Sequence, residues 1–184
     1  MNTQESGLDK TLAFLASEEF DKLIAATKEF WDECDYMGNP GAPDDVINTL
    51  KERYAEFYRA PAPEGYIAFM CKLDGFTYKD FDIYSCKEVM DEHWDGFYFI
   101  FGTEKKTFCA YDYGSGKYVT LKSEPTRLLS DTDSEGNSSY IEEAIYTPCE
   151  TYDSFADMFK TIMMFTLPAD KLNKVYPKLK GWDS

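Results

Sequence analysis

The side chain best suited to proton transfer is His93, the only histidine among the 184 residues. Imidazole is a common general acid, base or base partner of a nucleophile, so any Ser-His-Asp or Cys-His site would have to include this residue. His93 lies in "DEHWDG", directly before a strand-like segment, with no second base or ligand beside it in the sequence. We therefore expect an exposed loop histidine.

The many carboxylates suggest two further chemistries. Two of them about 5 to 10 Å apart could hydrolyse a glycosidic bond, but that arrangement needs a cleft. One segment matches an EF-hand calcium loop in its acidic residues and its glycine. Counted from Asp131 as position 1, the matches are Asp133 at position 3, Glu135 at position 5, Gly136 at position 6 and Glu142 at position 12. An EF-hand also needs a helix on each side, and no helix is expected before this loop. We predict no metal site, and a calcium loop stays as the alternative.

Two other patterns indicate structure rather than ligand binding. "YGSGK" combines glycines with a lysine, but it lies between strand-like segments rather than before a helix, and it predicts a hairpin turn. The five cysteines are widely spaced and form no C-x-x-C, so neither a zinc site nor a disulfide framework is indicated. Cys71 and Cys109 fall inside apolar patterns and are expected in the core. No cofactor is expected.

Helical periodicity dominates the first third of the chain and returns near its end. Apolar residues recur at three- and four-residue steps in five stretches, which begin near Leu8, after Ser17, near Asp44 or Asp45, at Glu64, and between Thr151 and Ser154. Ser17 is typical of an N-cap, and Gly75 is expected to close the helix opened by Glu64 as a left-handed residue. Pro168 should end the last helix.

Beyond Gly75 the apolar period changes to two, which is typical of strands. Four strand-like segments follow: "DFDIYS", "FYFIFG", "TFCAYDY" and "KYVTLK". Their short joins predict antiparallel hairpins, and "FYFIF", apolar on both faces, is expected in the middle of the sheet. "SDTDSEGNSS", residues 130–139, is expected to be a surface loop, and "YIEEAIY" is a weaker strand candidate.

The expected elements follow in the order of N-terminal helices, a meander of strands and a final helix. This order predicts an α+β fold with the C-terminal helix packed on one face of a mostly antiparallel sheet. We expect one domain over 1–184, with a helical extension at 1–43, a core at 44–167 and a basic tail at 168–184. The formal charge of −15 would repel nucleic-acid phosphates. A net negative charge is common among soluble proteins, and it would also attract a basic partner protein. The first residues show no signal-peptide pattern and no apolar run could span a membrane, so a cytoplasmic protein is expected.

Several short motifs follow one another in a recognisable order: Pro63, Tyr66, Phe69, Asp74, Gly75, Ile83-Tyr84, Phe101-Gly102, Tyr111-Asp112, Lys117-Tyr118 and Ser154-Phe155. This order resembles the SUKH superfamily, most closely its YrhA-like branch. This fold is shared by a yeast cell-wall synthesis regulator and many bacterial immunity proteins, and the resemblance covers roughly residues 44–165. The chain departs from the pattern at Ser85, where glycine is usual, and in the acidic insertion at 130–139.

The resemblance implies an α+β fold without catalysis and, for bacterial members, neutralisation of a cognate toxin such as a nuclease by direct binding. As the partner-binding patch we predict Asp91, Glu92, Trp94 and Asp95, because tryptophan is enriched at interface hot spots and the acids would face basic groups. The alternative is that Trp94 is a core anchor at the sheet edge. Two other functions stay open: a regulatory scaffold for a housekeeping protein, and a small-molecule binder or enzyme with an aromatic pocket.

Overall fold

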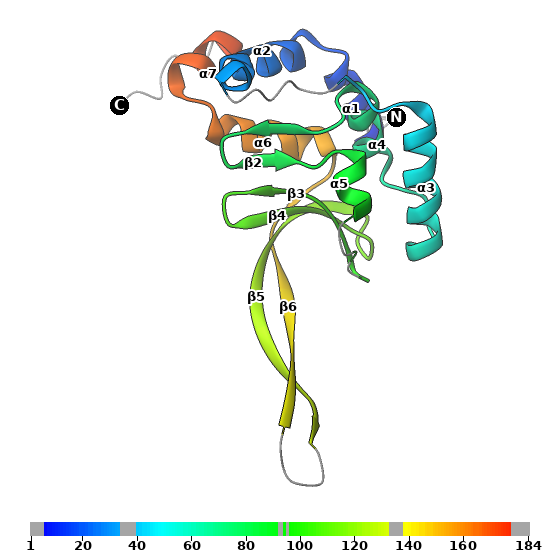
Figure 1. The fold of residues 1–184 in the computed structure, drawn as a ribbon. Helices are drawn as coiled ribbons and strands as arrows, with labels where there is room; N and C mark the ends of the chain where they lie inside the picture. Colours follow the sequence, from blue (N-terminus) through cyan, green and yellow to red (C-terminus); the bar gives the residue numbers. More distant parts are fainter. Residues whose placement is uncertain (1–5, 34–39, 92–93, 95, 133–137, 178–184) are drawn as a thin grey trace, which may run out of the picture.

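The computed structural model describes residues 6–33, 40–91, 94, 96–132 and 138–177, and it has an antiparallel sheet with helices gathered mainly on one side (Figure 1). In chain order the elements are α1 (Gly7–Leu15), α2 (Glu18–Glu33), α3 (Asp44–Tyr58), α4 (Glu64–Lys72), β1 (Phe76–Tyr78), β2 (Phe81–Ile83), α5 (Cys86–Asp91), β3 (Tyr98–Glu104), β4 (Thr107–Asp112), β5 (Lys117–Thr132), β6 (Ser138–Tyr152), α6 (Phe155–Thr166) and α7 (Ala169–Val175). The predicted α+β fold is confirmed. No helix in the described part of the chain has both the length and the apolar character needed to cross a membrane.

Local capping explains where the long helices begin. The Ser17 Oγ accepts a hydrogen bond from the Phe20 N–H at 3.3 Å, which confirms the predicted N-cap of α2. The Ser154 Oγ does the same for the Asp157 N–H at the start of α6. The prediction for Gly75 is wrong in position. Helix α4 ends at Lys72 with an extended C-cap, and the positive φ of Gly75 (95°) lies in the turn that leads into β1.

The sheet is a simple meander in which strands β1 to β6 lie in sequence order and every neighbouring pair is antiparallel. Strand β3 lies in the interior, as "FYFIF" predicted. The "YGSGK" turn between β4 and β5 is also confirmed, and Gly116 there has a φ of 69° that suits glycine. Strand β1 and helix α5 were not predicted, and α7 replaces part of the expected tail.

The main core lies between the helices and one face of the sheet, and it is dominated by aromatic rings. Phe159 of α6 is central: its ring centroid lies 5.5 Å from Phe69 of α4, 5.3 Å from Phe76 of β1 and 5.6 Å from Phe81 of β2. Edge and tilted arrangements of such rings stabilise beyond their buried area. Helix α6 therefore joins the sheet to the preceding helices. A smaller apolar cluster on the other face contains Ala110, Val119 and Leu121.

Strands β5 and β6 continue far beyond the rest of the sheet (Figure 1). Strand β4 pairs with β5 only as far as Lys122, whereas β5 pairs with β6 out to Thr132. We call residues 123–132 and 138–146, which form this two-stranded projection, the β-arm. Residues 130–132 and 138–139 of the expected surface loop are therefore strand. Residues 133–137 of that loop lie outside the described residues.

The β-arm also bears on the calcium alternative. Asp131 lies in β5 opposite Ser139, and Glu142 lies in β6 opposite Arg127. Strands therefore flank this segment on both sides, where an EF-hand requires helices. The EF-hand interpretation is wrong for this reason.

Candidate functional site

A group of aromatic side chains reaches solvent where the end of α3 meets the starts of β3 and the β4–β5 turn. We call Phe57, Trp94, Phe97 and Tyr113 the aromatic surface. Phe57 is 51% exposed, Phe97 76% and Tyr113 40%, which is unusual for large apolar residues. The buried Tyr58 ring joins two of them, since it lies 4.8 Å from Phe57 and 5.7 Å from Tyr113. The backbone of Phe97 lies beside Tyr113, whose N–H donates to the Phe97 carbonyl at 3.2 Å.

Trp94 anchors this surface to the fold. Its Nε1 donates a 2.7 Å hydrogen bond to the Val89 carbonyl, and its ring stacks on Tyr58 with centroids 5.9 Å apart. The Phe57 ring meets it edge-on at 5.7 Å, and the Arg53 guanidinium lies over it, also at 5.7 Å. A half-buried tryptophan held on several sides cannot reorient freely, so it fixes the positions of its exposed neighbours.

The structure therefore places the predicted patch at this surface only in part. Trp94 is packed against the core, as the anchor alternative proposed, and Asp91 is exposed at the end of α5. Glu92, Asp95 and His93 lie outside the described residues. Phe57, Phe97 and Tyr113 were not predicted from the sequence as surface residues.

Two tyrosines of α3 form the floor of the aromatic surface. The Tyr58 hydroxyl donates to the Tyr98 carbonyl at 2.8 Å. The Tyr54 hydroxyl is buried and has no hydrogen-bond partner among the described residues, although its ring contacts Tyr58 at 4.5 Å and Phe99 at 5.0 Å. Burial raises the pKa of Tyr54, so this phenol stays protonated near neutral pH. It acts as an apolar ring whose hydroxyl is left unsatisfied.

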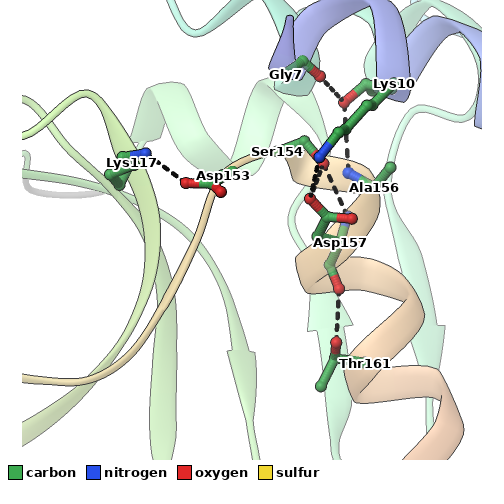
Figure 2. Close-up of polar contacts among 9 residues, drawn as sticks. Gly7, Lys10, Lys117, Asp153, Ser154, Ala156, Asp157 and Thr161 are labelled. Carbon is green, nitrogen blue, oxygen red and sulfur yellow. Dashed lines mark hydrogen bonds and ion pairs between the residues drawn. The ribbon is translucent and has the colours of Figure 1, made fainter. Parts of the chain in front are cut away.

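A second group has the residue types of a nucleophilic site, namely serine, lysine and aspartate, and lies around the start of α6 (Figure 2). The Ser154 Oγ is 2.8 Å from the Asp157 Oδ2, to which it donates, and it accepts from the Asp157 N–H at 3.0 Å. Lys10 of α1 lies 3.8 Å from the same carboxylate. Ser154 is 1% exposed, so its hydroxyl serves as a helix cap rather than facing a substrate.

Two other groups of contacts in Figure 2 involve neighbouring elements. The Thr11 Oγ1 donates to the Gly7 carbonyl at 2.9 Å and accepts from the Ala156 N–H at 3.4 Å, which links α1 to the first turn of α6. Lys117 of β5 forms an ion pair with Asp153 and lowers the pKa of that exposed carboxyl. The cluster joins α1, β5 and α6, and its role is structural.

The described cavity and thiols also bear on the enzyme alternative. A cavity of about 270 Å³ lies between α2 and the end of α4, and it is lined by Phe20, Asp21, Ile24, Ala25, Lys72 and Leu73. That alternative requires an aromatic pocket, whereas this cavity is small and Phe20 is the one aromatic residue in its lining. Cys71, expected in the core, is exposed; Cys86 and Cys109 are buried. Burial raises the pKa of Cys86 to about 12, so its thiol is protonated and unsuited to nucleophilic attack.

Comparison with protein-family models, with curated proteins and with solved structures gave no match to this chain. The resemblance to the SUKH superfamily therefore stays a prediction from the sequence motifs. The features of the chain that bear on its function are the exposed rings of the aromatic surface and the net negative charge.

Proposed function

We propose that this chain is a non-catalytic binding protein that captures a basic partner protein through the aromatic surface. The observation that carries the proposal is the group of exposed aromatic rings held in place by Trp94. Large apolar side chains gathered on a protein surface are typical of interaction sites. Aromatic residues are also the side chains most often found at interface hot spots.

Rigidity supports the same proposal. A flexible surface loses conformational entropy on binding, and this loss weakens the complex. Here Phe57 and Tyr113 pack on Tyr58, which is itself hydrogen-bonded to β3, and Trp94 is fixed by its own hydrogen bond. Little ordering remains to be done when a partner binds.

The charge of the chain indicates the chemistry of the partner. The chain has 34 acidic and 19 basic residues, and its field attracts positively charged proteins and repels nucleic acids. Asp91 and Glu56 are exposed acids on the two helices that border the aromatic surface. Such charges speed the association of the chain with a basic partner, whereas burial of the aromatic rings slows the dissociation of the complex.

The SUKH resemblance supplies the biological class of the partner. In that family the expected role of a bacterial member is to neutralise a toxin, and many toxic nucleases are basic. We propose such a toxin as the partner, with neutralisation by direct binding and no catalysis. The regulatory scaffold would use the same surface on a non-toxic partner.

Co-expression with the product of the neighbouring gene tests the function. We expect that product to be toxic alone, and the chain to relieve toxicity and copurify with it. Binding without toxicity would favour the scaffold. Failure both to rescue and to bind would contradict the proposal.

Two phenylalanines of similar exposure test the surface. Phe97→Ala removes a ring of the aromatic surface, whereas Phe165→Ala removes a 75% exposed ring of α6 outside it. We expect Phe97→Ala to weaken partner binding about 30-fold, as a hot spot would. Phe165→Ala should change it less than twofold. Equal effects of the two substitutions in calorimetric titrations would exclude the aromatic surface as the binding site.

A further inference from the structure

We propose that the outer edge of β6 between Ser138 and Ile145 is a docking strand, to which an extended basic segment of a partner protein adds as a seventh strand. This surface is separate from the aromatic surface and does not depend on it. The proposal rests on the pairing of the β-arm, on the distribution of edge-protecting residues, and on charge.

The β-arm leaves the rest of the sheet as a single pair of strands. Strand order in the sheet ends at β6, so among the residues that the structure describes this strand of 15 residues pairs with β5 alone. Beyond Lys122, β5 has left β4, and the two strands continue as an isolated ribbon. An isolated two-stranded ribbon is at best marginally stable in water. A third strand would pair the row of backbone N–H and C=O groups along its edge.

The two edges of the ribbon differ in their protection. Natural proteins protect open edges with prolines, lysines and bulges. Strand β5 carries Lys122, Pro125 and Arg127 where it leaves β4. Strand β6 has Pro148 and a register shift close to it, both near the base of the arm. From Ser138 to Thr147 it has no proline, lysine or arginine. The unprotected edge is therefore the outer part of β6.

The charges of β6 indicate which kind of segment would add to its edge. Between Ser138 and Thr147, strand β6 contains Glu142 and Glu143 and no basic residue, so it favours a basic segment over an acidic one. A second copy of the chain is disfavoured, because both copies carry a charge of −15 and antiparallel pairing centred on Glu142 and Glu143 would oppose like charges. Near the base of the arm, Ile145 is 51% exposed and offers an apolar contact to the added strand.

The probe is a ten-residue peptide of alternating lysine and valine, titrated into the full chain. We expect it to bind, and to slow amide hydrogen exchange between residues 138 and 147. One control peptide replaces each lysine by glutamate, and another keeps the lysines but has N-methyl groups on alternate amides, which removes the hydrogen bonds of one edge. Neither should give this protection. Equal binding of the N-methylated peptide would overturn the proposal, because charge alone would then explain it.

Matched variants locate the strand that binds. Glu143→Lys changes β6 and Glu124→Lys makes the same change on β5. We expect the first to weaken binding about three- to tenfold and the second less than twofold, as for exposed charge pairs. Equal effects would overturn the assignment to β6.

A shortened chain tests the arm as a whole. Ser123 and Tyr146 lie opposite each other in register, so an Asn-Gly turn in place of residues 124–145 closes the hairpin at the base. Peptide binding should be lost in this variant, and retained binding would overturn the proposal. Dimerisation of the unmodified chain through β6 without peptide, detected by light scattering and loss of the dimer in the shortened chain, would also overturn it.

Discussion

Replacement of Tyr54 by phenylalanine should stabilise the fold. The hydroxyl of Tyr54 is buried and has no hydrogen-bond partner in the part of the chain that the structure describes, whereas its ring contacts Tyr58 and Phe99. Phenylalanine keeps these ring contacts and removes one polar group that loses its water on folding. Tyr54→Phe is therefore a test of whether this hydroxyl opposes folding.

The size of the effect follows from the cost of an unsatisfied buried group, about 1–3 kcal/mol. Loss of the oxygen leaves a small gap that offsets part of the gain. We expect the free energy of unfolding to rise by about 1 kcal/mol, which for a chain of this length corresponds to about 2–4 °C in melting temperature.

Tyr118→Phe is the matched control, because it removes a buried hydroxyl that is used. The Tyr118 oxygen accepts from the Tyr66 N–H at 3.1 Å in the first turn of α4. Its removal leaves that backbone group unsatisfied and should cost about 1–2 kcal/mol. Burial raises the pKa of both phenols, so neither is ionised near neutral pH and charge does not enter the comparison.

Urea unfolding followed by circular dichroism measures both variants, with equal denaturant dependence required for the comparison. The expected result is opposite signs for the two substitutions. If Tyr54→Phe lowers the free energy of unfolding by more than about 0.5 kcal/mol, the hydroxyl has a partner in solution and the reasoning is refuted.

Two further predictions concern strand packing and pH. A Cβ at Gly102 would lie 2.2 Å from the Asp82 carbonyl oxygen, so Gly102→Ala should reduce the free energy of unfolding by about 1–3 kcal/mol. A Cβ at Gly96 meets no described atom within 4 Å, so Gly96→Ala should change the free energy of unfolding by less than about 0.5 kcal/mol. Equal urea midpoints of the two variants would contradict this comparison. Burial raises the pKa of Asp82 above 3.8, partly offset by the hydrogen bond from Thr77, so the folded state holds that proton more tightly than the unfolded state. Stability from this group is lost as pH rises from about 3.8 through the raised pKa, and Asp82→Asn should remove that loss; an unchanged pH slope of the urea midpoint would count against it.

Local side-chain chemistry made much of the fold predictable. Ser17 and Ser154 begin their helices through hydrogen bonds within one turn, and Gly116 suits its hairpin turn without distant contacts. Strand β1 and helix α5, of three and six residues, were missed because each is too short to stand out from the turns beside it, whereas the equally short β2 was predicted within the longer alternating run "DFDIYS". The strand candidate "YIEEAIY" lies in β6 and is confirmed. The extension of β5 beyond Lys122 was missed because its polar composition hides the alternation, and its register is continued from the hairpin with β4.

The aromatic surface was harder to predict, for a geometric reason. Phe57 and Tyr58 lie three and four residues after Tyr54, and both positions fall on the same side of a helix. The position of β3 decides between them, because the Tyr58 hydroxyl donates to the Tyr98 carbonyl while Phe57 turns outward. Sequence periodicity alone cannot make this choice.

The sequence order of the strands has a consequence for how the chain folds. Each strand pairs with the strand next to it in the chain, so the loops closed by pairing are short and the sheet can assemble progressively. The contact between Thr11 of α1 and Ala156 of α6 joins residues 145 positions apart. During synthesis this contact must wait until α6 has left the ribosome. We expect one apolar face of the sheet to stay bare until then, which makes the arrival of α6 the step that ends the chain's exposure to aggregation.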